Sequence, residues 1–280
     1  IARRFAVEVL HSDTNSGPAA ARNLGATAAS GEVLVFIDAD VLIDAAGLQR
    51  IATAFAEEPS LTALFGSYDA EPDAQDVVSQ YRNLLHHHTH QIGAPNANTF
   101  WSGYGAVRTG SFVELGGFDT SRYAYAMEDV ELGYRLSSAG CQIRLDRSLQ
   151  CKHLKAWTLI GFLGTDLLAR AIPWSQLIYE YPESSHALNV RGTQKIAVMS
   201  AALLFLSLVL GLFNPKFFVL SLLSLSAIVL FNISLFRCFA HARGVFFAVC
   251  CIPLHTLHHM VSGTGFLWVT TSRKIAVLKP

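Results

Sequence analysis

The chain has 280 residues, of which 51% are hydrophobic and 15% charged, and its formal net charge is zero. A balanced charge offers no general attraction for a polyanion, so we expect no nucleic-acid partner. The apolar residues are concentrated after residue 190, which is not typical of a wholly water-soluble protein. The five cysteines include no Cys-x-x-Cys pair, and this usage fits a reducing compartment.

Strand-like and helix-like segments alternate through the first part of the chain. Short apolar runs bounded by turn residues indicate strands, and Ala-rich or 3.6-periodic runs indicate helices. In chain order we expect a strand at Phe5–Leu10, a helix at Ala19–Ala29, a strand at Val33–Ile37, a helix from Asp44 to Phe55 and a strand at Leu61–Phe65. The alternation predicts an α/β fold with a mostly parallel sheet covered on both faces.

The strand at Val33–Ile37 runs directly into two carboxylates, Asp38 and Asp40. Its continuous apolar run predicts burial on both faces, and unpaired acids at the end of a buried strand need a metal ion or a cationic partner. Alternation along the strand would place both acids on one side, where they could face one ion. Hard oxygen ligands suit Mg²⁺ or Mn²⁺, which bind diphosphates. The alternative is an ordinary acidic turn.

A helix from Asp76 to about Ile92 carries a cluster of four histidines at positions 86, 87, 88 and 90. Such a cluster raises the possibility of a zinc site. Consecutive helical residues point to different faces, however, so no more than two of these side chains could share a metal ion. We expect them instead on a partly solvated or membrane-proximal face of the helix.

Strands and one amphipathic helix continue the domain. A strand is expected at Gly103–Val107, where the glycines indicate either a close approach to a ligand or a bulge. The helix at Met127–Ser138 has Glu128 and Asp129 in its first turn, which could be simple pairing with the helix dipole or a functional acidic pair. Two short strands, at Cys141–Leu145 and Leu149–His153, are expected to follow.

The remainder of the chain has the pattern of a membrane-associated region. Trp157–Leu177 is amphipathic with aromatic and basic residues, which favours a helix on a membrane surface over a core helix. Ile196–Phe213 and Phe217–Phe236 are free of acidic residues and long enough to span a bilayer, and Val245–Val269 is a third candidate. We therefore expect residues 1–155 to form the α/β domain, 156–190 an interfacial segment, and 191–280 a membrane domain with two or three transmembrane helices.

Basic residues around the spans predict the orientation of the chain. Arg191 and Lys195 precede the first span and Arg237 and Arg243 follow the second, whereas only Lys216 lies in the turn between them. The positive-inside rule then places the α/β domain on the cytoplasmic face of the inner membrane in a multi-pass protein. Three full spans would put the basic C-terminal residues, Lys279 among them, outside, so the third segment could be re-entrant.

Three motifs together resemble family 2 glycosyltransferases of the GT-A fold. They are Gly17-Pro18-Ala19-Ala20-Ala21-Arg22-Asn23-Leu24-Gly25, Phe36-Ile37-Asp38-Ala39-Asp40, and Gly116-Gly117-Phe118-Asp119 followed by Glu128-Asp129. The resemblance covers about Phe5 to Trp174. It implies a metal-dependent enzyme that moves a sugar from a nucleotide-diphosphate donor, and the membrane tail is similar to those of members that use lipid-linked or polymeric acceptors.

The resemblance also implies roles for individual residues. Asp40 would bind the metal ion directly, and Asp38 would lie at the metal or the nucleotide ribose. Arg22 and Asn23 would lie by the nucleotide, and His153 could be a further metal ligand or an ordinary structural histidine. Asp129 would be the catalytic base, with Glu128 as its neighbour and second choice. Such enzymes generally invert the anomeric centre in a single displacement, so no covalent nucleophile is expected.

This sequence departs from the family pattern in two places. It begins at Ile1 rather than Met, and we expect the first strand, which carries most nucleobase contacts in the family, to be missing, so a UDP-sugar rather than a GDP-sugar is a family-level expectation. The Gln-x-x-Arg-Trp motif of processive synthases is absent, although Arg170 and Trp174 could serve a related role at the diphosphate. The acceptor is expected to be lipid-linked or a saccharide. The alternatives are a polysaccharide synthase subunit and a catalytically inactive membrane scaffold.

Overall fold

The computed structural model describes residues 4–182 and 192–277. The expected boundary at residue 190, Arg191 and Lys279 lie outside these residues. In chain order the elements are α1 (Gly17–Ala28), β1 (Val33–Ile37), β2 (Val41–Leu42), α2 (Ala45–Glu57), β3 (Leu61–Tyr68), α3 (Val77–Gln91), β4 (Asn96–Ala97), β5 (Tyr104–Arg108), α4 (Thr109–Glu114), α5 (Glu128–Ser138), β6 (Gln142–His153), α6 (Leu159–Asp166), the π-helical turn η2 (Leu167–Ala171), α7 (Ile172–Glu180), α8 (Gly192–Gly211), α9 (Phe217–Phe231), α10 (Ile233–Arg243) and α11 (Val245–Val277).

A mixed sheet forms the centre of the α/β domain. Its strand order is β1-β5-β3-β6-β2, with β4 paired to β6. Among the described residues only β3 and β6 pair in parallel, and the other four pairings are antiparallel. The α/β class is therefore confirmed, but the expectation of a mostly parallel sheet is wrong. That expectation assumed a helical crossover between neighbouring strands, whereas β5 enters between β1 and β3 in the opposite direction.

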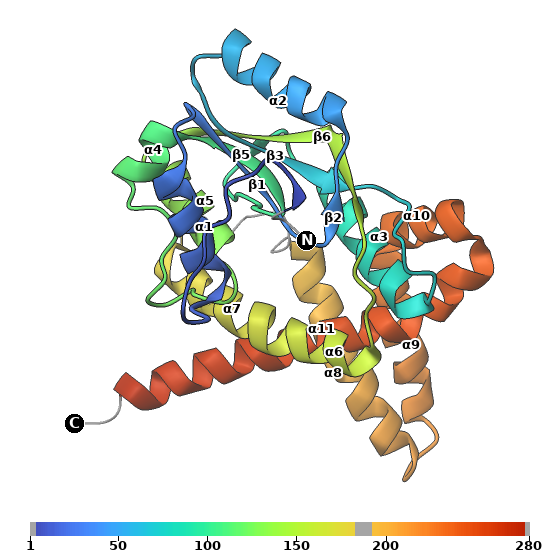
Figure 1. Ribbon diagram of the computed structural model, residues 1–280. Helices are drawn as coiled ribbons and strands as arrows, with labels where there is room; N and C mark the ends of the chain where they lie inside the picture. The colour runs from blue at the N-terminus through green and yellow to red at the C-terminus, as the bar shows by residue number, and fades with distance from the viewer. Residues whose placement is uncertain (1–3, 183–191, 278–280) are drawn as a thin grey trace.

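Helices cover both faces of the sheet (Figure 1). On one face α2 packs over β3, β5 and β6 through a core that includes Ile51, Phe55 and Leu64. On the other face α1, α4 and α5 enclose a second core that includes Phe36 and Leu132. All eight residues of the central strand β3 are buried, because both cores contact it. The result is three layers, and the site described below lies at one edge of the middle layer.

The outer part of the sheet differs from the sequence expectation. Strand β1 is an edge strand of the described sheet, with Val35 37% and Ile37 42% exposed, so the predicted burial on both faces is wrong. Residues 5–10 are exposed and do not form the expected strand, since no neighbouring strand pairs with them. The two short strands expected after α5 are one continuous strand, β6, that bends where its register with β3 shifts.

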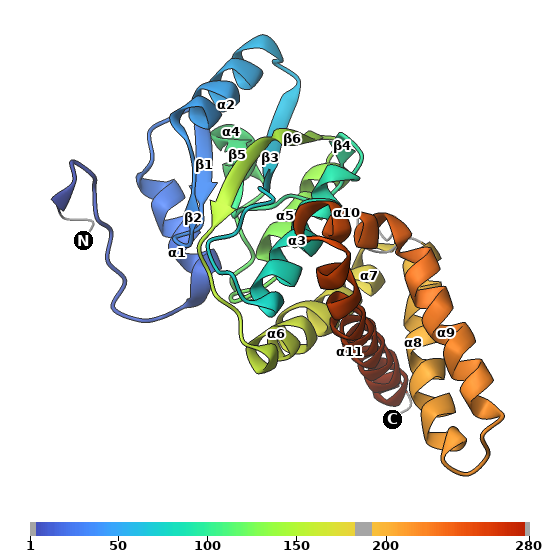
Figure 2. The ribbon, with the colours of Figure 1, turned by 90° about the vertical axis from the view of Figure 1, so that its right-hand side faces the viewer.

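The C-terminal helices extend from the α/β domain (Figure 2). Helices α8 and α9 form a hairpin that projects away from the domain. Two helices are long and apolar enough to cross a membrane, at Gly192–Gly211 and Val245–Ile275, and the bent pair α9–α10 could make a third span. Helix α11 contains Pro253 and packs along α3, α6, η2 and α7, in addition to α8.

The expected second span is interrupted at Asn232. Helices α9 and α10 meet there at 72°, so Phe217–Phe236 is not one straight helix. The Asn232 side chain donates to the carbonyl of Ile228 at 2.9 Å, and its backbone N–H donates to Val229, three residues back. A polar side chain that bonds its own backbone competes with the regular helical pattern, which explains the break.

A polar junction joins α3 to the C-terminal helices. Asp166, at the end of α6, forms an ion pair with Arg82 of α3 at 2.8 Å. Its carboxylate also lies 2.6 Å from Nδ1 of His258 of α11. The Arg82 and Asp166 side chains are each only 2% exposed. One turn away Tyr81 bonds His255 of α11 at 3.0 Å. We call Arg82, Asp166 and His258 the α3 junction. The amphipathic segment α6–η2–α7 is thus partly core, although Ile160 and similar apolar residues stay exposed.

Candidate active site

The two aspartates of the central motif lie in a turn between β1 and β2. The backbone N–H of Asp38 donates to Gly103 at 3.0 Å, and that of Val41 donates to the Asp38 carbonyl at 3.3 Å. Strand β1 ends at Ile37, so alternation along a strand does not decide where the two side chains point, and that argument was wrong. Pairing of β1 with β5 nevertheless holds the turn against the loop that precedes β5.

Arg22 of α1 connects the three sequence motifs. Its guanidinium donates to Oδ1 of Asp38 at 2.6 Å and to Oε1 of Glu128 at 2.5 Å, and its side chain is 17% exposed. A charge-assisted pair on each side fixes the planar fork of an arginine better than a single contact. Residues 106 positions apart in sequence are therefore held at one edge of the sheet.

Asn23 supports the loop of the third motif rather than facing an open space. Its side-chain amide donates to the carbonyl of Phe118 and accepts from the N–H of Phe118, both at 2.9 Å. Gly117 has φ of +69°, and a Cβ there would lie 2.7 Å from Oδ1 of Asn23. The close approach therefore requires glycine at this position. Asn23 positions the loop, and its expected place beside the nucleotide stays a prediction.

The acidic pair opens α5. Met127, immediately before it, has φ of +67°, which turns the chain so that both carboxylates lie at the helix N-terminus. Oδ2 of Asp129 accepts from the backbone N–H and the hydroxyl of Ser102, at 3.1 and 3.3 Å, and Oδ1 accepts from the N–H of Val130. Ser102 is a residue that the sequence analysis missed, because no pattern links the loop before β5 to α5.

Burial and mutual repulsion control the charge of this pair. Burial, together with the neighbouring charge of Asp129, raises the pKa of Glu128 to about 7, and Arg22 offsets part of that rise. Burial also raises the pKa of Asp129. The hydrogen bond from Ser102 and the positive charge of Arg22 lower this pKa, but they offset only part of the rise. A carboxylate with a raised pKa is a stronger proton acceptor than an ordinary aspartate.

Asp40 and His153 come together through the pairing of β2 with β6. Val41 is opposite His153 in that ladder, and Nε2 of His153 lies 3.9 Å from Oδ2 of Asp40. The imidazole stacks on Tyr68 with ring centroids 4.3 Å apart, and burial lowers the pKa of His153. Asp40 is 41% exposed, so its carboxylate remains accessible to a ligand.

These residues fit a divalent ion that is completed by its substrate. Within residues 4–182 and 192–277 no three acidic, His or Cys side chains form a ready-made metal cage. A neutral imidazole and an accessible carboxylate that face each other still supply two donors, with one oxygen of Asp38 nearby taken up by Arg22. Mg²⁺ is commonly held by one or two carboxylates together with substrate phosphates, and Mn²⁺ also accepts imidazole.

Arg170 and Trp174 lie in different surroundings. Arg170, in η2, contacts Nε2 of His86 at 2.6 Å, and burial with repulsion from Arg82 lowers the pKa of Arg170 to about 10. Trp174, in α7, packs against the buried cluster that includes Met127 and so supports the start of α5 from below. The expectation that both residues lie at the donor site stays a prediction.

The histidine helix packs inward rather than forming a solvated face. His88 and His90 are buried, His86 and His87 are half-buried, and Nδ1 of His87 bonds the carbonyl of Tyr68 at 2.7 Å. The expectation of a partly solvated face is wrong for His88 and His90, because α10 and α11 cover one side of α3 and Trp101 lies against another. The membrane-proximal alternative stays a prediction.

The glycines before β5 accommodate the chain's own aromatic residues. A Cβ on Gly103 would lie 2.4 Å from the Trp101 ring, and one on Gly105 would lie 2.7 Å from the Phe100 ring. Close approach is thus required, but the described contacts are with Trp101 and Phe100. Neither a bulge nor a ligand is needed to explain these glycines.

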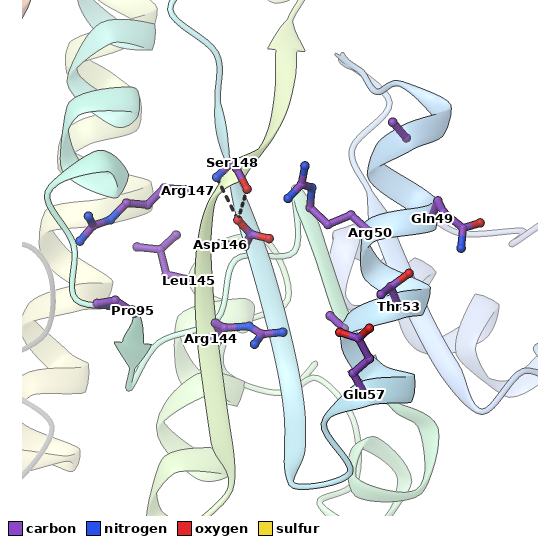
Figure 3. A pocket seen from close by; sticks show the side chains of 12 residues that line it. Gln49, Arg50, Thr53, Glu57, Pro95, Arg144, Leu145, Asp146, Arg147 and Ser148 are labelled. Carbon is purple, nitrogen blue, oxygen red and sulfur yellow. Dashed lines mark hydrogen bonds between the residues drawn. The ribbon is translucent and has the colours of Figure 1, made fainter.

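A hollow elsewhere on the domain holds none of the expected site residues. It has a volume of about 760 Å³ and lies between α2 and β6. Figure 3 shows Arg50 from α2 and Arg144 from β6 pointing into this space. Arg144 is paired with Glu58 at 2.6 Å, and Arg147 donates to the carbonyl of Gly93. Size alone therefore does not identify the active site here.

Comparison with known proteins agrees with the motifs. Residues 1–116 match the family described as "Glycosyl transferase family 2". The match covers the N-terminal part of the chain, less than half of its length, so these residues are similar to that family. The sequence is 28% identical over 148 residues, half of this chain, to the "Pre-mycofactocin glycosyltransferase" of two strains of Mycobacterium tuberculosis. The matched part covers 30% of the length of those relatives. The first two sequence motifs lie within the matched residues, so their resemblance to this family is confirmed.

Two solved structures are distantly similar. One is the mannosyltransferase PcManGT from Pyrobaculum calidifontis in complex with GDP-Man and Mn²⁺, with TM-score 0.49 and 16% identity, covering 95% of this chain and 71% of that chain. The other is GalNAc-T7 with UDP, GalNAc and Mn²⁺, with TM-score 0.41 and 17% identity, covering 66% of this chain and 43% of that chain. At TM-scores below 0.5 these likenesses do not decide the fold, and the family rests on the sequence matches.

Proposed function

We propose that this protein is a membrane-bound inverting glycosyltransferase, and that it transfers a sugar from a nucleotide-diphosphate donor to a lipid-linked or saccharide acceptor. The observation that carries the proposal is the pair of contacts from Arg22 to Asp38 and Glu128. They bring the first sequence motif (Gly17–Gly25), the turn with Asp38 and Asp40, and the acidic pair of the third motif (Glu128-Asp129) to one edge of the sheet. A purely structural cluster would not need three carboxylates, two of them with raised pKa, around one arginine.

The donor would bind at the turn between β1 and β2. Asp40 and His153 would hold the divalent ion, with Asp38 beside it, and the ion would neutralise charge on the departing diphosphate. Arg22 would keep Asp38 oriented through the contact described above. Arg170 is a second buried cation of the domain, and we assign it to binding the diphosphate of the donor. Trp174 would support this region through its packing against the cluster that includes Met127. A UDP-sugar remains the expected donor on family grounds alone.

The acceptor hydroxyl would be activated by Asp129. In a single displacement the hydroxyl oxygen forms a bond to the anomeric carbon while the bond from that carbon to the diphosphate breaks. The proton of the hydroxyl passes to the Asp129 carboxylate, and the nucleoside diphosphate leaves. The raised pKa of Asp129 suits proton acceptance, and Ser102 keeps its carboxylate oriented. Glu128 is less suited, because Arg22 already engages it and it is 5% exposed.

The apolar C-terminal helices support attachment to the membrane. The distribution of basic residues supports a location of the α/β domain on the cytoplasmic face of the inner membrane. Arg243 at the end of α10 contacts Gln80 at 2.8 Å and Glu71 at 3.1 Å. Both acceptors belong to the α/β domain, so this end of α10 lies on the same side as the domain. That contact supports the orientation inferred from the positive-inside rule.

The decisive test is metal-dependent donor binding by the full chain in nanodiscs. We expect nucleotide release from at least one UDP- or GDP-hexose when Mn²⁺ or Mg²⁺ is added, and its loss in Asp40→Ala. Glu57→Gln is the matched control, because Glu57 is an exposed carboxylate on α2, far from the turn. Absence of nucleotide binding by folded wild-type protein with every donor would reject the enzyme and leave a membrane scaffold.

A further inference from the structure

A second hollow lies between α7 and the C-terminal half of α11, beside the loop that follows the third motif. Its volume is about 400 Å³, within the range of small-molecule sites. Three segments line it: the loop provides Arg122 and Tyr123, α7 provides Gln176 and Glu180, and α11 provides Trp268, Val269, Ser272 and Arg273. We call this hollow the α7–α11 cleft. It is separate from the turn that holds Asp38 and Asp40.

The loop side of the cleft is held rigidly. Asp119 accepts from Nε of Arg122 at 3.0 Å and from the N–H and hydroxyl of Ser121, and these hydrogen bonds lower the pKa of Asp119 to about 2 against the effect of burial. Arg122 also pairs with Glu180 of α7 at 2.9 Å, and the Tyr123 hydroxyl donates to the same carboxylate. Asp119 ends the Gly-Gly-Phe-Asp part of the third motif. The motif is therefore bonded directly to Arg122, which lines the cleft.

The helix side of the cleft is held by Tyr179. Its ring stacks on Phe266 at 6.3 Å, its hydroxyl bonds Thr270 at 2.8 Å, and the Arg273 guanidinium lies 4.8 Å above it. These contacts fix α11 against α7. Trp268, one helical turn before Ser272, remains 65% exposed and forms part of the cleft. A large indole that is left uncovered in a built hollow is available to a ligand.

The lining chemistry selects the class of ligand. The lining contains two cations, Arg122 and Arg273, and one carboxylate, Glu180. Arg122 is neutralised both by Glu180 and by Asp119, which lies outside the lining, so the cleft offers little net attraction for a phosphate. Planar polar groups, a hydroxyl and an aromatic face instead match a neutral pyranose, which has a rim of hydroxyls and an apolar face of C–H groups. Leu267, also 65% exposed on the candidate span α11, continues the apolar surface beyond the cleft.

We infer that the α7–α11 cleft binds the neutral sugar headgroup of a lipid-linked acceptor, with the lipid lying along α11. The inference rests on the proposed glycosyl transfer and names its acceptor class. Tyr123 belongs to the same buried cluster as Met127 and Val130, which flank Glu128 and Asp129. A sugar in the cleft is thus bound on the wall that also positions the base.

The test measures binding and transfer with full-length protein in phosphatidylcholine nanodiscs that contain glucosyl-, galactosyl- or mannosyl-diacylglycerol. We expect at least one of these lipids to bind, and Trp268→Ala to weaken its apparent affinity about tenfold, as loss of a ring contact does. Gln176→Ala should weaken it less, and Trp268→Phe should restore most of it. Phe246→Ala is the matched control, because Phe246 is an 84% exposed ring at the other end of α11.

Nucleotide release from the donor into water separates this inference from the proposed function. That release is measured on the wild-type protein in nanodiscs that contain no glycolipid. If wild-type protein releases nucleotide but none of the three lipids binds, or if Trp268→Ala binds them as wild type does, the sugar assignment is overturned and the enzyme stands. Preferential binding of phosphatidic acid, or of the free hexoses without lipid, would also overturn it. Failure of nucleotide release in wild type would instead count against the proposed function.

Discussion

Two charged clusters in this molecule are built from similar residues and differ in how completely they neutralise themselves. In the α3 junction, Asp166 is 2% exposed and is contacted by both Arg82 and His258. At the sheet edge, three carboxylates, those of Asp38, Glu128 and Asp129, act on the single guanidinium of Arg22.

The difference in charge balance supports the sheet edge, rather than the α3 junction, as the candidate ligand site. A buried pair with matched charge is a structural contact, and removal of one partner leaves an uncompensated charge. A surplus of negative charge is costly unless a cation or a proton offsets it, and it raises the pKa of Glu128 and Asp129. Charge balance is therefore our criterion for separating the candidate active site from the junction, in preference to the size of a nearby hollow. The four predictions below test that distinction.

The largest effect is expected at the base. Asp129→Asn should lower the rate of sugar transfer by a factor of about 10² to 10⁴, the usual contribution of general base catalysis, and leave donor binding close to wild type. The melting temperature should not fall, because the change removes a buried charge from an acidic cluster. Transfer assays in nanodiscs and thermal unfolding measure both. A variant that transfers at the wild-type rate would move the base to Glu128.

Substitutions in the α3 junction should change the stability of the protein rather than the rate of sugar transfer. Asp166→Ala leaves Arg82 buried without its partner and should destabilise the protein by about 3–5 kcal/mol. Thermal or denaturant unfolding in detergent measures this. The double variant Arg82→Met/Asp166→Leu should recover most of the loss, since an apolar pair of similar volume leaves no unpaired charge. Equal instability of the single and double variants would mean that His258, rather than Arg82, controls the junction.

Acidity should reveal the surplus charge at the sheet edge. The pKa of Glu128 is raised to about 7, so folded protein binds more protons than unfolded protein between about pH 4.5 and 7, and this residue makes stability fall as pH rises through that window. The contribution is at most about 3 kcal/mol. Glu128→Gln should remove it, seen as a wild-type-minus-variant difference in unfolding free energy measured in EDTA. A flat difference would mean that Glu128 is ionised throughout.

The smallest effect concerns the loop of the third motif. Gly116→Ala should cost about 1 kcal/mol, because φ of +77° strains a side chain but no atom lies within 4 Å of the added Cβ. Gly117→Ala meets the same strain at φ of +69° and also the Asn23 amide at 2.7 Å, so it should cost more and lower transfer. Paired unfolding and activity measurements compare the two. Equal costs would show that Asn23 yields without affecting the site.

Local patterns were sufficient for most helices and for the site motifs. Helices were predicted to begin at Asp44 and Asp76, and these two residues cap α2 and α3 by accepting from the N–H groups of Gly47 and Ser79. The apolar run at Val33–Ile37 correctly predicted β1. These features depend on residues within one turn or one strand, so sequence reasoning can reach them.

Features that depend on distant contacts were not predictable. The antiparallel entry of β5 between β1 and β3, the inward packing of the histidine helix and the role of Ser102 all require knowledge of what lies opposite in space. Asp166 and His258 lie 92 positions apart, and no local sequence pattern around either residue predicts their contact. The break at Asn232 is different, since a polar residue within an apolar span was a visible signal.

The course of α11 along α3, α6, η2 and α7 has a practical consequence for anyone who wishes to isolate the catalytic part. A fragment that ends before α8 would retain Asp166 and Tyr81 but lose His258 and His255, their partners. It would also uncover the apolar side of α3 and α6 that α10 and α11 cover. Truncation at the start of the first hydrophobic helix should therefore give an aggregating fragment rather than a soluble one. The reason is that α10 and α11 also cover apolar residues of the α/β domain.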